Sequence, residues 1–127
     1  MSRPVLLDAS FLIAFEHETA AGEHGPARRF LASLRGRPLV VSIVTVEEIL
    51  EGAADTGVAM ASLQRFSIQG LHLAQARRCA LLQRRSARRM DENDAWLVAT
   101  AETITADVLG SDRAAFERLG SAYLRFR

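Results

Sequence analysis

The 127-residue sequence contains no lysine, only one cysteine and no long apolar run. The single Cys79 cannot form an internal disulfide, and it excludes a cysteine-rich zinc site. No apolar stretch approaches the roughly 18–20 residues that a bilayer-spanning helix needs. The N-terminal MSRPVLLDAS is not typical of a secretory signal. We therefore expect a cytoplasmic protein with no membrane partner.

Charge is nearly balanced in total but unevenly distributed along the chain. All sixteen basic residues are arginine, and with fifteen acidic residues they give a formal net charge of +1, which argues against a generic basic coat for nucleic acid. Residues 1–55 hold 5 arginines and 8 acids, residues 56–90 hold 7 arginines and no acid, and residues 91–127 hold 4 arginines and 7 acids. A basic middle segment therefore lies between two acidic ones.

The alternation of short apolar runs with helical patterns predicts one α/β domain over residues 1–127. With 49% hydrophobic and 24% charged residues, the chain has the composition of a folded globular protein. We expect a central parallel sheet of four to five strands flanked by helices. The predicted strands are 5–7, 39–41, 67–71, 107–110 and 122–126. The predicted helices are 10–15, 26–35, 45–52, 55–66, a helix starting at 73, 91–102 and 113–119, with a loop at 17–26.

Four acidic residues lie where the carboxyl ends of these strands should meet. Asp8 follows the first strand, Glu48 lies on the helix after the second, and Asp112 follows the fourth. Asp94 begins the helix that precedes the fourth strand. Carboxylates that converge on one edge repel each other unless a cation neutralises them, and oxygen ligands suit Mg²⁺ or Mn²⁺. Such sites activate water for attack on a phosphodiester.

Each acid also has a purely structural interpretation. Asp8 and Asp112 could be helix N-caps, Thr45-x-x-Glu48 fits a capping box, and Asp94 could complement a helix dipole. Capping, however, does not require the four acids to meet. Their joint pattern favours a metal site over four independent caps.

The segments around these acids resemble the motifs of PIN-domain ribonucleases, and among those the VapC-type toxins of bacterial toxin–antitoxin modules. The similar segments are VLLDASFLI at 5–13, VTVEEILEG at 44–52 and NDAWLVATA at 93–101. A fourth, Leu109-Gly110-Ser111-Asp112, is similar to the family's strand-Thr-x-Asp element. The resemblance covers essentially the whole chain in length, element order and motif spacing.

The resemblance assigns roles to particular residues. It implies that Mg²⁺ or Mn²⁺ is held by a catalytic acidic quartet: Asp8, Glu48, Asp94 and Asp112. Ser10 matches a small polar residue that lines the family's site. Gly110 departs from the family, which usually has Thr or Ser there, and Ser111 could supply the missing hydroxyl. Asp107 is a reserve candidate, although as the first residue of a strand it should lie at the opposite edge of the sheet.

The function implied is a metal-dependent endoribonuclease that acts as the toxin of a toxin–antitoxin pair. The resemblance further implies a homodimer and a cognate antitoxin whose C-terminal segment blocks the acidic site. Its substrate would be RNA, with structured RNA such as tRNA or rRNA among the candidates. Four arginines are candidate phosphate contacts, although a solvated helix face explains them equally well. They are Arg84, Arg85, Arg88 and Arg89.

Two alternatives remain open. The chain could be a PIN-fold module that binds RNA or protein without turnover, an idea that the Gly110 departure favours. A phosphoacceptor receiver or a phosphatase is disfavoured, because Ser10 stands where a second aspartate should follow Asp8.

Overall fold

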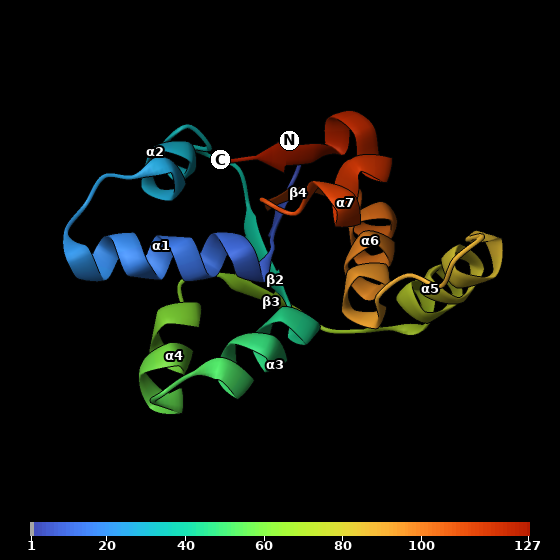
Figure 1. Ribbon diagram of the computed structural model, residues 1–127, viewed down its shortest axis with the longest axis horizontal. Coiled ribbons are helices and arrows are strands. Elements are labelled where there is room, and N and C mark those ends of the chain that lie inside the picture. Colours follow the sequence, from blue (N-terminus) through green and yellow to red (C-terminus); the bar gives the residue numbers. More distant parts are fainter. Residues whose placement is uncertain (1) are drawn as a thin grey trace.

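The computed structural model describes residues 2–127 as an α/β domain built on a five-stranded sheet (Figure 1). The strand order is β3-β2-β1-β4-β5, and every neighbouring pair is parallel. The strands are β1 (Val5–Leu7), β2 (Leu39–Ser42), β3 (Ser67–Gln69), β4 (Asp107–Gly110) and β5 (Tyr123–Arg125). The predicted parallel sheet of four to five strands is confirmed, and the carboxyl ends of all five strands lie at one edge.

Helices cover both faces of the sheet. The helices are α1 (Ala9–Ala21), α2 (Pro26–Ala32), α3 (Ile43–Gly52), α4 (Thr56–Leu63), α5 (Leu73–Arg85), α6 (Glu92–Ile104), α7 (Arg113–Phe116) and the 3₁₀ segment η1 (Glu117–Ala122). In Figure 1, α1 to α4 lie on one side of the strands, and α5 to α7 lie on the other. No helix within residues 2–127 is long and apolar enough to cross a membrane.

The two hydrophobic faces follow from the alternation of side chains along each strand. Val5 and Leu7 point to the α1 side, where Phe11 is fully buried, while Leu6 points to the α6 side with Val98. All three residues of β1 have no exposed surface. This explains why a central parallel strand reads as a continuous apolar run rather than as an alternating one.

The predicted loop at 17–26 is wrong over its first half, because α1 continues to Ala21. The helix ends where Gly22 adopts a left-handed conformation (φ 68°) and its N–H turns back onto the last turn. Glu18 is buried inside this extension, and its carboxylate accepts hydrogen bonds from the N–H groups of Ala27 (3.0 Å) and Arg28 (2.8 Å). These two hydrogen bonds cap the start of α2. The polar segment thus stabilises a helix, which its composition does not indicate.

The capping box proposed for Thr45 and Glu48 is also wrong. The helix α3 begins two residues earlier than predicted, and its N-cap is Ser42, whose hydroxyl accepts from the Val44 N–H at 3.1 Å. Thr45 lies inside the helix and is fully buried. Glu48 is therefore not occupied in capping α3. The helix predicted at 113–119 is likewise divided into α7 and η1.

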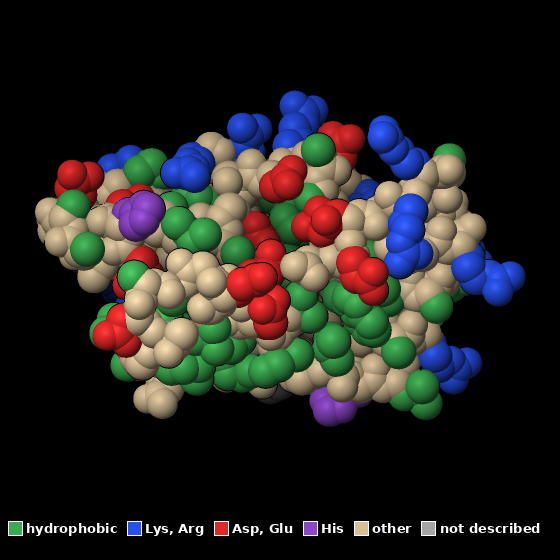
Figure 2. All heavy atoms as spheres, turned by 60° about the horizontal axis from the view of Figure 1, so that its bottom comes forward, with side chains coloured by type: hydrophobic (Ala, Val, Ile, Leu, Met, Phe, Trp, Pro, Cys, Tyr) green, Lys and Arg blue, Asp and Glu red, His purple; other side chains and the backbone are tan. Residues whose placement is uncertain are grey.

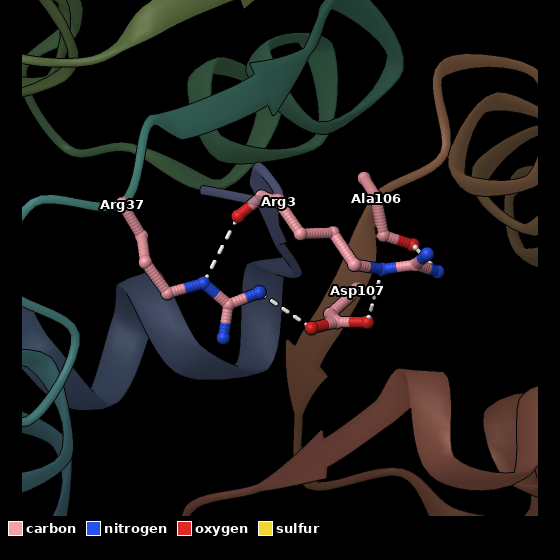
Figure 3. Close-up of polar contacts among 4 residues, drawn as sticks. All are labelled: Arg3, Arg37, Ala106 and Asp107. Atoms are coloured by element: carbon pink, nitrogen blue, oxygen red, sulfur yellow. Dashed lines mark hydrogen bonds and ion pairs between the residues drawn. The ribbon is translucent and has the colours of Figure 1, made fainter. Parts of the chain in front are cut away.

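At the amino edge of the sheet, Asp107 is held by two arginines (Figure 3). Its carboxylate pairs with Arg3 Nε at 2.7 Å and with Arg37 Nη2 at 2.5 Å. Arg37 Nε also donates to the Arg3 carbonyl at 2.9 Å. These contacts tie the segments that precede β1, β2 and β4 together. They also confirm that Asp107 begins its strand at the edge opposite to the predicted site.

Candidate metal centre at the carboxyl edge

The fold brings the predicted acids to one edge of the sheet. Asp8 directly follows β1, and its N–H donates to the Leu109 carbonyl of β4 at 2.9 Å. Helix α6 and strand β4 are joined by a tight turn at Thr105, which has a left-handed φ of 55°. Because this turn reverses the chain at the amino edge, the first turn of α6, with Asp94, lies near the carboxyl edge.

The Asp8 carboxylate is oriented by Ser10. The Asp8 Oδ2 atom accepts from the Ser10 hydroxyl at 2.6 Å and from the Ser10 N–H at 3.3 Å, so Asp8 is also the N-cap of α1. The Ser10 hydroxyl oxygen in turn accepts from the Ser111 N–H at 3.1 Å. This chain of hydrogen bonds joins the ends of β1 and β4. The Ser10 side chain thus contacts Asp8, whereas Ser111 contributes its backbone N–H.

Gly110 lies against these two side chains. A Cβ atom at this position would be 3.1 Å from both Cβ and Oδ2 of Asp8, and 3.3 Å from the Ser10 hydroxyl. A larger residue there would require Asp8 or Ser10 to shift. The departure from the family pattern is therefore in direct contact with the candidate site.

Asp94 has the most strongly perturbed carboxyl group of the set. Burial, followed by the negative charges of Asp91, Asp112, Asp8 and Glu48, raises the pKa of Asp94 to about 6 from its ordinary value of 3.8. All four charged groups that act on it are acids. The charges that raise the pKa of Asp94 are thus those of Asp91 and of the other three predicted acids.

The other two half-buried acids show the same direction of shift. Burial raises the pKa of Asp8, the Ser10 hydrogen bonds oppose that rise, and the charge of Asp112 adds to it. Burial also raises the pKa of Glu48, which is opposed by a hydrogen bond from the Asn93 side chain and reinforced by Asp8. The neighbouring Glu47 is exposed. Of the two adjacent glutamates, Glu48 is the one that faces the other acids.

Asp112 lies at the rim of the site. It caps the short helix α7, with Oδ1 accepting from the Ala115 N–H at 3.1 Å. Asp94 and Asp112 both line a cavity of about 220 Å³. The complete lining is Met90, Asp91, Asp94, Asp112, Ala114, Ala115 and Arg118. The capping interpretation therefore holds for Asp8 and Asp112, but it does not prevent either residue from facing the shared edge.

The residues fit a hard divalent cation by their chemistry. Within residues 2–127, none of the quartet forms an ion pair, although the same chain pairs five other acids with arginine. Carboxylate and hydroxyl oxygens are the donors that Mg²⁺ and Mn²⁺ prefer. No three described His, Cys, Asp or Glu side chains are already arranged as a metal cage. The acids therefore provide charge and donors at one edge without a closed coordination shell.

Arginines lie along two sides of the face that carries this acidic region. Figure 2 shows acidic side chains gathered near the middle of one face and arginines toward its upper and right-hand rims. The four candidate RNA contacts, Arg84, Arg85, Arg88 and Arg89, are all exposed at the end of α5 and in the segment that follows. Arg89 pairs with Glu92 at 3.2 Å, and no ion pair involving the other three occurs in the described chain.

Two residues near the site could not be identified from the sequence. One is Asn93 on α6, which lies near enough to Glu48 on α3 to oppose the rise in the pKa of that carboxyl. The other is Arg118, which is the one arginine in the cavity lined by Asp94 and Asp112. No local pattern distinguishes either residue, because each reaches the site only through the packing of α3, α6 and η1. Cys79 is buried.

The fold and the site together define the class of this protein: a parallel α/β domain with acidic residues at the carboxyl edge of its sheet. The sequence matches the PIN domain over residues 5–121, and the chain therefore belongs to the PIN domain family. A search of curated protein sequences found no match.

Solved structures share this fold over nearly the whole chain. A toxin–antitoxin complex from Klebsiella pneumoniae is 20% identical with a TM-score of 0.77, covering 97% of this chain and 98% of that one. DNA-bound VapBC from Salmonella typhimurium is 15% identical with a TM-score of 0.76, covering 98% and 99%. VapC20 from Mycobacterium tuberculosis, described as a sarcin–ricin loop cleaving toxin, is 20% identical with a TM-score of 0.66, covering 91% and 95%. The predicted fold and family resemblance are confirmed.

Proposed function

We propose that this protein is a metal-dependent endoribonuclease and the toxin of a toxin–antitoxin pair. The observation that carries the proposal is the group of unpaired acids at the carboxyl edge, where Asp94 is perturbed by four other carboxylates. A cleft that concentrates uncompensated negative charge is suited to a divalent cation. The match to the PIN domain and the fold shared with a toxin described as cleaving the sarcin–ricin loop support nuclease chemistry.

The proposed ligands are Asp8, Glu48, Asp94 and Asp112. A bound Mg²⁺ or Mn²⁺ would polarise water and the phosphodiester oxygens. Ser10 would hold the Asp8 carboxylate in one orientation through its 2.6 Å hydrogen bond. Ordered carboxylates lose less freedom when the site is loaded.

The RNA backbone is proposed to contact the exposed arginines at the end of α5. An acidic site repels a polyanion, so substrate binding needs cationic groups near it. The guanidinium groups of Arg84, Arg85 and Arg88 form no ion pair in the described chain and are available for phosphates. Arg89 would have to exchange Glu92 for a phosphate.

The proposed partners are a cognate antitoxin and a second copy of this chain. Apolar side chains exposed on α4 and around β3 and α5 support such contacts. They are Val58, Met60, Ile68, Leu71 and Leu73. The Klebsiella and Salmonella neighbours are described as complexes with an antitoxin, which supports the first of these partners. The mass of the purified chain, measured by light scattering, tests the dimer.

The test of catalysis is cleavage of structured RNA by the purified chain with Mn²⁺. We expect cleavage that chelation abolishes, and a loss of more than about 100-fold in Asp94→Asn and Asp8→Asn, since even groups that only support a ligand typically contribute 10–100-fold. Glu51→Gln is the matched control, because Glu51 is exposed and belongs to no part of the site. Growth inhibition on expression should follow the same order. Absence of cleavage, with growth inhibition unchanged in both aspartate variants, would reject the proposal.

A PIN-fold binding module without turnover is the second candidate. It is favoured by one observation, that no three described acids already form a metal cage. RNA binding that is indifferent both to Mg²⁺ and to Asp94→Asn would select this alternative. Binding that responds to both would reject it.

A further inference from the structure

A second cavity lies along the same helix as the candidate metal centre. Its volume is about 480 Å³, within the range of about 300–1,000 Å³ that is usual for ligand pockets. The walls come from the end of α6, from α5, from η1 and from the segment before β1. The lining residues that matter for its charge are Arg3, Arg78, Glu102 and Arg118.

This cavity is positively charged. Three arginines line it against a single acid, Glu102, which pairs with Arg78 at 2.6 Å. Arg3 is engaged with Asp107. Arg118 is exposed, and no ion pair involving it occurs within residues 2–127. The cavity therefore has an unpaired guanidinium group available for an anion.

Arg118 connects this cavity to the acidic site. It lines both the 480 Å³ cavity and the 220 Å³ cavity of Asp94 and Asp112. The two cavities follow one another along α6, since Asp94 lines the smaller one while Ala101, Glu102 and Thr105 line the larger one. Seven to eleven residues separate these positions, or about 10–17 Å at 1.5 Å per residue. That distance corresponds to about three to five stacked nucleotides at 3.4 Å each.

We infer that the larger cavity is a phosphate subsite for an RNA strand, and that Arg118 joins it to the acidic site. The inference rests on the proposed function, since it takes the acidic site as the place of phosphodiester cleavage. Guanidinium groups suit phosphate because their planar donors can bind two oxygens at once. A strand whose reacting phosphate lies at Asp94 would pass Arg118 and place a phosphate a few nucleotides away in the larger cavity. Arg118 is a positioning residue in this arrangement.

The test is the salt dependence of RNA binding, measured by fluorescence anisotropy with a labelled single-stranded oligoribonucleotide and a chelator present to prevent cleavage. We expect Arg118→Gln to weaken binding roughly ten-fold at low salt, as for one charge-assisted hydrogen bond. The slope of log affinity against log salt should fall by about 0.7, the value for one lost contact to single-stranded nucleic acid. A variant sample that merely contained less folded protein would not show this change in slope.

Two further variants sharpen the test. Arg35→Gln removes another exposed arginine, one that lines neither cavity, and should leave affinity and slope unchanged. Ala122→Glu places a carboxylate in the larger cavity while Arg118 stays intact, and it should also weaken binding. The proposal is overturned if Arg118→Gln and Ala122→Glu both behave like Arg35→Gln. Arg118-dependent binding of polyglutamate without an effect on RNA would instead assign the cavity to an acidic protein segment, which also overturns it.

Cleavage of the same RNA with Mn²⁺ separates the two proposals. If the wild-type chain cleaves but Arg118→Gln binds RNA normally, the subsite is wrong and the nuclease function stands. If the chain binds RNA through Arg118 but never cleaves it, the subsite stands and the nuclease function fails.

Discussion

The two edges of one sheet hold aspartates in opposite electrostatic states. At the amino edge, Asp107 is compensated by Arg3 and Arg37 at 2.7 and 2.5 Å. At the carboxyl edge, Asp8 and Asp94 have no arginine partner, and burial together with neighbouring acids raises the pKa of each. An acid that is already neutralised holds the fold together, whereas acids left uncompensated side by side require a cation from outside. The difference separates a structural edge from a candidate functional edge.

The largest expected effect comes from breaking the amino edge. Asp107→Asn leaves two arginines without their partner, one of them largely buried. We expect a loss of about 2–3 kcal/mol in the free energy of unfolding, below the 3–5 kcal/mol of a fully buried pair because these groups are partly exposed. Urea denaturation measures this loss. RNA cleavage per folded molecule should be unchanged, and a specific loss of cleavage would contradict the division between the two edges.

An intermediate effect is expected at Ser10, on the carboxyl edge. Ser10→Ala removes the 2.6 Å hydrogen bond that orients Asp8 and lowers its pKa. Cleavage should fall 10–100-fold, and its pH profile should move to higher pH because the Asp8 carboxyl becomes harder to ionise. Ser33→Ala is the control, since that exposed hydroxyl only contacts the Phe30 carbonyl. An unshifted profile in Ser10→Ala would remove Ser10 from the site.

The smallest effect is a gain in stability at Asp94. The folded protein raises the pKa of Asp94 from 3.8 to about 6, so the folded state binds this proton more tightly than the unfolded state. The resulting stability is fully present below pH 3.8 and is lost as the pH rises through about 6. Because Asp94 is partly exposed, we expect Asp94→Asn to stabilise the metal-free protein by only ~1 kcal/mol at neutral pH.

A gain in stability in Asp94→Asn is the opposite of the loss expected when a purely structural acid is replaced. It should disappear near pH 4, where wild-type Asp94 is protonated, and thermal unfolding at both pH values measures it. A destabilised Asp94→Asn at neutral pH would mean that Asp94 supports the fold, as Asp107 does.

The parts of this molecule that depend on local sequence could be predicted. Short apolar runs bounded by polar residues located all five strands, and Asp8 and Asp94 were placed by their positions after a strand and at a helix start. The predicted helix boundaries were wrong where a residue other than the expected one begins or ends the helix. Ser42 is the N-cap in place of the expected Thr45, and α1 continues beyond the predicted helix at 10–15 until Gly22 ends it.

The contacts that complete the site depend on tertiary packing. Nothing in the sequence indicates that a Cβ atom at Gly110 would lie 3.1 Å from Asp8, or that Arg118 on a 3₁₀ segment lines the cavity of Asp94. Asn93 precedes Asp94 in the predicted motif, yet its relation to Glu48 depends on how α3 packs against α6. Residues that act through such contacts can be identified only from the folded structure.

The central claim is that the carboxyl edge binds a divalent cation, and titration calorimetry with Mn²⁺ tests it most directly. We predict that the wild-type protein and Glu47→Gln bind Mn²⁺ alike, that Asp94→Asn does not bind it, and that affinity falls as the pH drops below about 6 because the metal must displace the Asp94 proton. Absence of Mn²⁺ binding by the wild-type protein, or binding that survives Asp94→Asn unchanged, would contradict the account.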